Sequence, residues 1–370
     1  MSNNERPPQQ FKIQNLHRIY ALTGIRAIAA SMVFLYHNRK YWRDDIPPVL
    51  LKFLNELHVG VSVFFVLSGF LIAYTYGDKP LRSKKDYLKY LLVRLARIFP
   101  VYLFILSAMY IDQGFPSTKE TILTYTMAHG FSNSYNLNGI PQAWSLTVEL
   151  CFYTLAPFLY FLLKRNIIKT VIILILLALI VTCIGYGLHA LHHNKGSFFY
   201  PWFFIFNSSF PGRFPEFLAG MLLAHHISNV KTQQPLVQKR SYATLIGGLA
   251  CIAVIYLISV FEKDIYHDGI QHPVGLLIRN IIFPGAVVLF LYGLIKERTW
   301  LQRFLSTRVM ILLGGASYIF YLIHIGYING KWKEWQLFPD RNFILLWLTA
   351  IVGFLLVEKP TYGWLRKKIR

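Results

Sequence analysis

The first stretch of the chain that could do chemistry runs from Tyr20 to His37, with the sequence YALTGIRAIAASMVFLYH. It is apolar and about one bilayer long, yet it contains Arg26 and His37. A charged group in the hydrocarbon core costs roughly 2.5–3.5 kcal/mol, so residues of this kind mark functional sites. Because the two are eleven residues apart, they lie near one helix face, about 16 Å apart along the axis. The stretch therefore predicts a membrane helix that lines a polar cavity.

A second basic pair, Arg94 and Arg97, lies in the segment RLARIFP. Residues three apart on a helix are neighbours, so the two guanidinium groups can act together. Their planar donor groups are suited to binding phosphate oxygens in pairs. Arginines at a membrane surface also anchor to lipid head groups, and the sequence leaves both interpretations open.

A third candidate group is Trp144, Ser145 and Glu149, in the segment WSLTVEL. Ser145 and Glu149 are four residues apart and share a helix face. An acidic residue inside a span is a functional candidate, but Glu149 is equally suited to pairing with Arg213 or Arg26. Arg213 and Glu216 are three apart and can neutralise each other. We interpret His324, in an apolar run with tyrosine neighbours, as a packing residue.

The composition indicates a membrane protein. Of 370 residues, 55% are hydrophobic and only 15% are charged, against roughly 25% in soluble domains. The net charge of +21 would favour nucleic-acid binding in a soluble protein, but here the basic residues lie in loops, where they meet membrane lipids. We expect no nucleic-acid partner. Three cysteines within apolar runs, without a CxxC pair, predict neither disulfides nor a metal site.

The chain is predicted to be an all-α polytopic protein of about ten transmembrane helices, with an amphipathic basic cytoplasmic helix between spans two and three. Residues 1–18 would form a cytoplasmic tail, 19–358 a single membrane domain, and 359–370 a basic cytoplasmic tail. The apolar runs that predict spans lie near residues 19–38, 58–77, 98–112, 144–163, 167–190, 213–227, 242–261, 274–295, 309–329 and 342–358.

Loop charges predict the orientation of the chain. With both termini in the cytoplasm, 25 of the 38 Lys and Arg residues lie on the cytoplasmic side, ten lie outside, and three lie within spans. Positive residues accumulate on the cytoplasmic side of membrane proteins. The sequence therefore predicts a cytoplasmic (inner) membrane protein with both termini inside, with Arg26 toward the cytoplasm and His37 toward the outer face.

Six segments, taken together, resemble the acyltransferase-3 family of integral membrane O-acyltransferases, many of which acetylate surface polysaccharides. They are Arg26-x10-His37, FFVLSGF at 64–70, RLARIFP at 94–100, WSLTVEL at 144–150, RFPEFLAG at 213–220 and SYIFYLIH at 317–324. The resemblance covers essentially the whole chain in order. It implies a ten-helix core, a cytoplasmic acyl-CoA donor, and functional roles for Arg26, His37, Arg94 and Arg97. Some relatives continue into an extracytoplasmic SGNH-type domain, which we do not expect here.

The resemblance leads to a functional hypothesis. Acyl-CoA, with acetyl-CoA expected, would place its phosphates against Arg94 and Arg97, with Arg26 a further candidate to hold them. Its arm would pass Arg26 and present the thioester near His37. His37 would act as general base for a hydroxyl of an extracytoplasmic glycan or lipid-linked glycan, either directly or after the acyl group pauses on the enzyme. Trp144 and Ser145 are candidate donors to the oxyanion, and Glu149 a candidate to orient the histidine or the hydroxyl. No metal is expected.

Two alternatives stay open. The acceptor could be a lipid or a small molecule, which the sequence does not distinguish from a glycan. From a different class, a transporter or flippase for an anionic solute would also need a polar stripe and a basic cytoplasmic patch. Neither an internal repeat nor an interrupted helix pair stands out in the sequence, and both would favour transport.

Overall fold

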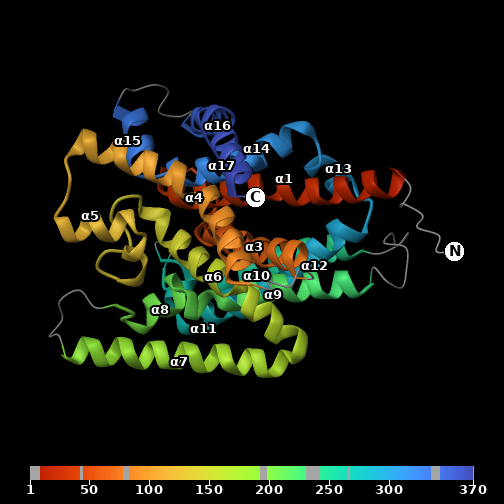
Figure 1. The fold of residues 1–370 in the computed structure, drawn as a ribbon, viewed down its shortest axis with the longest axis horizontal. Coiled ribbons are helices and arrows are strands. Elements are labelled where there is room, and N and C mark those ends of the chain that lie inside the picture. Colours follow the sequence, from red (N-terminus) through yellow and green to blue (C-terminus); the bar gives the residue numbers. More distant parts are fainter. Residues whose placement is uncertain are drawn as a thin grey trace.

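The computed structural model describes residues 9–41, 45–77, 83–191, 198–230, 242–264, 267–334 and 342–369. These residues form helices and loops, with one isolated β-bridge between Ser132 and Phe198. Figure 1 shows the helices in their places. In the first half of the chain they are α1 (Gln9–Asn38), α2 (Pro48–Asn55), α3 (Gly60–Tyr76), α4 (Lys84–Gln113), α5 (Thr118–Tyr125), α6 (Trp144–Arg165) and α7 (Ile167–Leu191). In the second half they are α8 (Trp202–Ser208), α9 (Phe210–Val230), α10 (Ala243–Ser259), α11 (Pro273–Leu277), α12 (Phe283–Lys296), α13 (Trp300–Leu305), α14 (Arg308–Ile323), α15 (Tyr327–Glu334), α16 (Asn342–Gly353) and α17 (Lys359–Ile369).

The all-α polytopic prediction is confirmed. Among the described residues, six helical segments are long and apolar enough to cross a membrane, and a bent pair of helices gives a seventh. Nine of the ten predicted spans fall on continuous helical segments and the remaining one, 309–329, on two helices, but not every helix meets both criteria. The apolar helix α10 has only 17 residues, for example. The predicted orientation stays a prediction, and several basic loop residues behind it, including Lys79, Arg82 and Lys239, lie outside the described residues.

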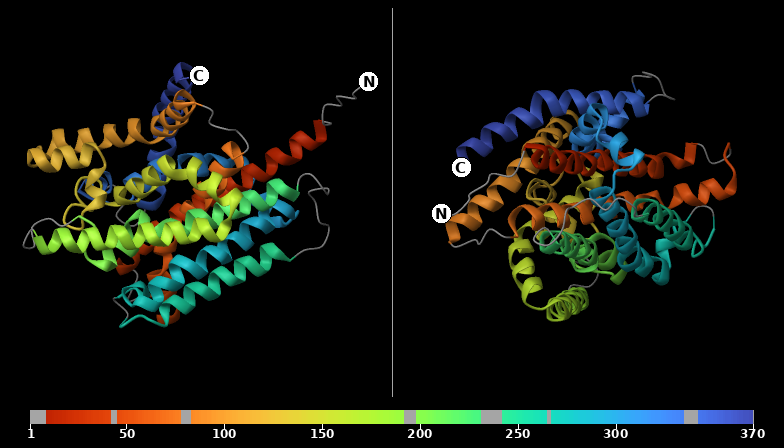
Figure 2. Two further views of the ribbon diagram at one scale, coloured as in Figure 1. Left: turned by 60° about the horizontal axis from the view of Figure 1, so that its bottom comes forward. Right: turned by 90° about the vertical axis from the view of Figure 1, so that its right-hand side faces the viewer.

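Helix α3 lies at the centre of the bundle and packs against α1, α6, α9 and α12 (Figure 1). Its closest partner is α9, because each helix presents a glycine to the other's backbone. A Cβ on Gly69 would collide with the carbonyl of Phe217, and one on Gly220 with the carbonyl of Val66. Small residues permit this approach between membrane helices. Figure 2 shows α7, α9, α12 and α10 as roughly parallel rods in that order.

The predicted basic helix and the predicted third span form one continuous helix, α4. Ser83 caps its start, since its hydroxyl accepts from the Asp86 amide while the Asp86 carboxylate accepts from the Ser83 amide. Pro100 lies inside the helix but does not end it. Tyr90 and Tyr318 tie α4 to neighbouring helices by donating to the carbonyls of Tyr153 and Ile98. Arg94 and Arg97 therefore lie midway along a helix and point into the bundle.

The predicted ninth span, 309–329, is broken. Helix α14 ends at Ile323, Gly326 adopts φ of 80°, and α15 leaves at an angle of 81°. A break within a membrane exposes carbonyl groups that need donors. The Gln142 amide supplies them to Tyr321 O at 2.9 Å and Leu322 O at 2.5 Å, and Asn329 donates to His324 O at 2.7 Å. The interruption that sequence analysis did not find is thus held by a side chain from a distant segment.

Candidate active site

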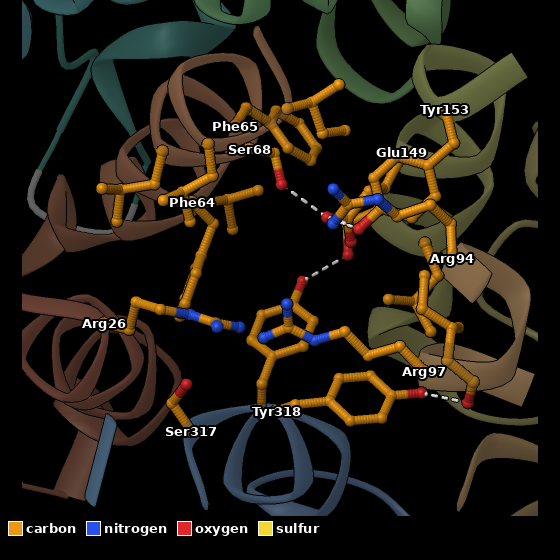
Figure 3. Close-up of a pocket in the computed structure, with 18 residues that line it drawn as sticks. Arg26, Phe64, Phe65, Ser68, Arg94, Arg97, Glu149, Tyr153, Ser317 and Tyr318 are labelled. Atoms are coloured by element: carbon orange, nitrogen blue, oxygen red, sulfur yellow. Dashed lines mark hydrogen bonds between the residues drawn. The ribbon is translucent and has the colours of Figure 1, made fainter. Parts of the chain in front are cut away.

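Helices α1, α3, α4, α6 and α14 enclose a cavity of about 70 Å³ (Figure 3). Its polar and charged lining consists of Arg26, Ser68, Arg94, Arg97, Ser145, Glu149, Tyr153, Ser317, Tyr318 and Tyr321. Five residues that the sequence singled out, Arg26, Arg94, Arg97, Ser145 and Glu149, are therefore brought together from three helices. His37 and Trp144 are not among the residues that line it.

Arg26 and Arg97 face each other across this cavity in Figure 3. Each acts electrostatically on the other, which raises the cost of keeping both charged in a buried place. Arg26 lies over the Phe64 ring, with its guanidinium carbon 5.8 Å from the ring centre. No hydrogen bond joins either guanidinium to another described residue, so their donors are free to bind an anionic ligand.

Arg94 lies in a cage of tyrosines. Its guanidinium carbon is 5.0 Å from the centre of the Tyr76 ring, 5.7 Å from that of Tyr153 and 6.0 Å from that of Tyr90. Its Nε is buried and has no hydrogen-bond partner. Cation–π contacts of this kind compensate part of the lost hydration. The cage places the Arg94 guanidinium at the cavity wall between aromatic rings.

Two carboxylates, Glu149 and Glu358, lie near the three arginines. Glu149 Oε1 accepts from Ser68 Oγ and from Tyr153 OH, both at 2.6 Å. Glu358 lies in the π-helical turn Phe354–Glu358, is buried, and acts electrostatically on Arg26 and Arg97. Its Oε2 has no hydrogen-bond partner. Sequence analysis did not select Glu358; the available signal was an acidic residue at the end of an apolar run.

The side chains of Ser145 and Trp144 lie in different parts of the bundle, although the two residues are adjacent in sequence. The Ser145 hydroxyl lies in the cavity, 2.9 Å from Gln142 O and 2.8 Å from the Tyr321 hydroxyl. Trp144 instead faces α9, where its ring centre is 5.9 Å from the Arg213 guanidinium. Arg213 pairs with Glu216 at 2.7 Å, so Glu149 is not its partner. Of the two candidate oxyanion donors, only Ser145 lines the arginine cavity.

His37 lies at the far end of α1 from Arg26, beside a second histidine. Its ring centre is 4.8 Å from that of Tyr36 and 5.2 Å from that of His324. Glu149 is bound to Ser68 and Tyr153, so these contacts do not place it as the group that orients His37. The ring neighbour of His37 on the bundle side is His324.

His324 connects His37 to the arginine cavity. Its Nδ1 lies 2.6 Å from the carbonyl of Tyr321, and the Tyr321 side chain lines the cavity. A carbonyl accepts only, so Nδ1 carries the proton and Nε2 keeps its lone pair. His324 is fully buried and its Nε2 has no partner. His324 is therefore packed in the bundle, as expected, but its hydrogen bonding is not satisfied, because Nε2 is unused.

These side chains form one polar column across the bundle. It begins at Arg94, Arg97 and Arg26, continues past the hydrogen-bonded pair Ser145 and Tyr321, and ends at His324 and His37. Such an arrangement can bind an anion at one end and remove a proton at the other. The helix break at 324–326 lies at the histidine end of the column.

The chain belongs to the acyltransferase family whose model, named Acyl_transf_3 and described as an acyltransferase domain, matches residues 19–358. It is similar to O-acetyltransferase OatA of Staphylococcus aureus strain NCTC 8325, with 23% identity over 94% of this chain and 57% of the relative. A protein of strain COL that bears the name "Putative O-acetyltransferase SACOL0978" is also 23% identical, over 94% of this chain and 58% of its own length. The chain thus spans less than two thirds of the length of these relatives. No solved structure matches it.

Proposed function

We propose that the protein transfers an acetyl group from cytoplasmic acetyl-CoA to a hydroxyl of an extracytoplasmic glycan. Membership of an acyltransferase family, and similarity to proteins named O-acetyltransferases, support acyl transfer. The observation that carries the finer proposal is the polar column, with three arginines at one end and two histidines at the other. It matches a donor that is anionic at one end and reactive at the other.

The arginine end would hold the donor. Arg26 and Arg97 have guanidinium donors that no described residue occupies, and oxygen atoms of the donor, on its phosphates or along its pantetheine arm, can accept from such groups. A cavity of about 70 Å³ can take a few water molecules or a short acyl group. This small size favours acetyl over a long acyl chain.

The histidine end would carry out the transfer. His37 removes the proton of the acceptor hydroxyl while its oxygen attacks the thioester carbonyl. A C–O bond forms, the C–S bond breaks, and the proton passes to the CoA thiolate. The unpartnered Nε2 of His324 can accept a hydrogen bond from the second imidazole or from the hydroxyl, and so position the base. The Ser145 hydroxyl, whose proton is now donated to Gln142 O, can turn to donate to the carbonyl oxygen as that oxygen gains charge.

The orientation proposed from the loop charges places the arginine end at the cytoplasmic side of an inner membrane. Both termini would then be cytoplasmic, and the histidine end would face the outer surface. Donor and acceptor would meet inside the bundle, and the acetyl group would cross the membrane without the CoA.

The amount of acetyl ester on the surface glycans of intact cells tests the proposal. His37→Ala should remove acetyl ester from the extracted surface glycans, whereas His226→Ala, an exposed histidine on α9, should leave it unchanged. Retained folding of both variants is checked by their thermal unfolding in detergent. Full acetylation in the His37→Ala cells would contradict the proposal. If the His37→Ala cells instead lose acetyl ester from their lipid fraction, the acceptor is a lipid.

One observation favours a second candidate, a transporter for an anionic solute. The break between α14 and α15 is the kind of interrupted helix that forms substrate sites in transporters. Acetyl-CoA distinguishes the two functions: an acyltransferase consumes it and releases free thiol, whereas a transporter leaves the thioester intact.

A further inference from the structure

A second, larger cavity of about 750 Å³ lies next to the arginine cavity. It is enclosed by the end of α3, the start of α4 and the end of α6. Two lysines and four tyrosines contribute to its wall, namely Lys84, Lys164, Tyr76, Tyr87, Tyr90 and Tyr160. Nothing in the reaction proposed above uses these six residues.

One layer of side chains separates the two cavities. Ile72 lines both of them. Tyr76 and Tyr90 line the larger cavity on one side and pack against Arg94, which lines the smaller cavity, on the other. The buried, unpartnered Nε of Arg94 therefore lies behind the shared wall. A ligand that occupied both cavities would pass this guanidinium.

The tyrosines of the wall are held in place. Tyr87 donates to Thr154 O at 3.0 Å and Tyr90 donates to Tyr153 O at 3.1 Å, which fixes α4 against α6. The rings of Tyr76 and Tyr90 meet edge to face, with centres 5.0 Å apart. Rings fixed in this way offer flat surfaces to an aromatic base, and stacking of a base on an aromatic side chain is favourable.

The lysines give the cavity a positive charge. Lys164 Nζ donates to Gly77 O at 3.1 Å and lies 5.0 Å from the centre of the Tyr160 ring, so its ammonium group is at the cavity wall. Lys84 lies on the α4 side of the same cavity. Among the described residues that line it, none has an acidic side chain. These residues therefore present no like charge to an entering anion.

We propose that this larger cavity binds the nucleotide end of the acyl-CoA donor. The adenine ring packs against the tyrosines, the ribose phosphate meets Lys84 and Lys164, and the pyrophosphate passes Arg94. The pantetheine arm then enters the smaller cavity past Ile72, whose side chain lines both cavities and would turn aside to admit it. The smaller cavity, of about 70 Å³, is too small for a nucleotide. This inference rests on the proposed function and assigns to the donor a site that the arginine cavity alone cannot provide.

Truncated donors test the assignment. The variant Lys84→Ala/Lys164→Ala should raise KM for acetyl-CoA at least tenfold, while KM for acetyl-pantetheine, which lacks the nucleotide, stays unchanged. The matched control is Lys85→Ala/Arg165→Ala, which removes the adjacent exposed charges that do not line the cavity. The control should leave KM unchanged for both donors. An equal change for both donors in the test variant, or no change for either, would overturn the assignment.

Ligand binding by the wild-type protein provides a second test, which can be made even where the double variant does not fold. Adenosine 3′,5′-bisphosphate should raise the unfolding temperature of the wild-type protein in detergent. If phosphatidylglycerol raises it and adenosine 3′,5′-bisphosphate does not, the cavity is a lipid site and the inference is wrong. Failure of the proposed function is recognised separately, because the wild type would then consume neither acetyl-CoA nor acetyl-pantetheine.

Discussion

The broken helix depends on one amide, and its removal should have a measurable cost. Gln142 is buried, and its Nε2 donates to the carbonyls of Tyr321 and Leu322 at 2.9 and 2.5 Å, with a longer contact of 3.4 Å to Ile325 O. Gln142→Met keeps the volume of the side chain but removes these donors. The Tyr321 carbonyl keeps His324 Nδ1 as a partner, whereas no other described donor replaces the amide at Leu322.

The magnitude follows from this inventory. Each lost hydrogen bond costs about 1 kcal/mol, and a buried carbonyl left without a partner about 1–3 kcal/mol. Gln142 Oε1 is itself buried without a partner, so its removal offsets part of the loss. We expect the free energy of unfolding to fall by about 2 kcal/mol. The activity should also fall, since the broken segment positions His324.

Thermal and chemical unfolding of the purified protein in detergent measures the change. Gln113→Met provides the control, because it makes the same substitution at the exposed end of α4. A stability for Gln142→Met that equals the control would refute the view that this amide holds the break.

Three further predictions concern His324, the buried ion pair of Arg213 with Glu216, and Glu262. His324→Gln should lower kcat at least tenfold and change the pH dependence of kcat with little effect on KM for acetyl-CoA; an unchanged pH profile would make His324 a packing residue after all. Arg213→Met should destabilise the protein by about 3–5 kcal/mol, because it leaves the buried Glu216 carboxylate unpaired, and Arg213→Met/Glu216→Leu should recover most of that loss in the same unfolding assay. Burial raises the pKa of Glu262, in the loop after α10, to about 7. The Glu262 carboxyl therefore ionises at a higher pH in the folded chain than in the unfolded chain. The free energy of unfolding falls as the pH rises toward 7, because the unfolded chain loses this proton first. Glu262→Gln should leave stability unchanged at pH 5 and raise it at pH 8; equal stability of the two proteins at both pH values would contradict this.

The spans could be predicted from the sequence because length and hydropathy are local properties. Apolar runs of bilayer length coincide with helices throughout the described residues. The sequence predicts the basic helix and the third span as separate elements, although no capping or breaking signal lies between Arg97 and Pro100. In the structure they are one helix, α4, which tolerates the proline.

The arginine cavity could be predicted in part. Arg26, Arg94 and Arg97 were selected from their types, their spacing and a family resemblance, and they meet in one cavity. Glu358 and Tyr76 could not be selected, because they join the site through contacts between helices that are far apart in sequence. No periodicity indicates that the end of one span reaches the arginine of another.

The histidine end shows the same limit. His324 lies in an apolar run, and its ring alone says nothing about its partners. Its unpartnered Nε2 lies at the break after Ile323, where Gln142 from another segment donates to the Leu322 carbonyl. The sequence showed each residue, but only the packed structure shows that His324 lies beside His37.

The central claim is that one column carries an acetyl group from a cytoplasmic thioester to an outer hydroxyl. Inside-out membrane vesicles from cells that produce the chain test it directly, since their cytoplasmic face is outward and the native acceptor is present. Acetyl-CoA labelled in the acetyl group is added outside, and label is counted in the glycan recovered from the interior. We expect label in wild-type vesicles, accompanied by release of free CoA thiol outside, and none above background with His37→Ala. Equal labelling with His37→Ala, or intact labelled acetyl-CoA inside the vesicles, would contradict the claim.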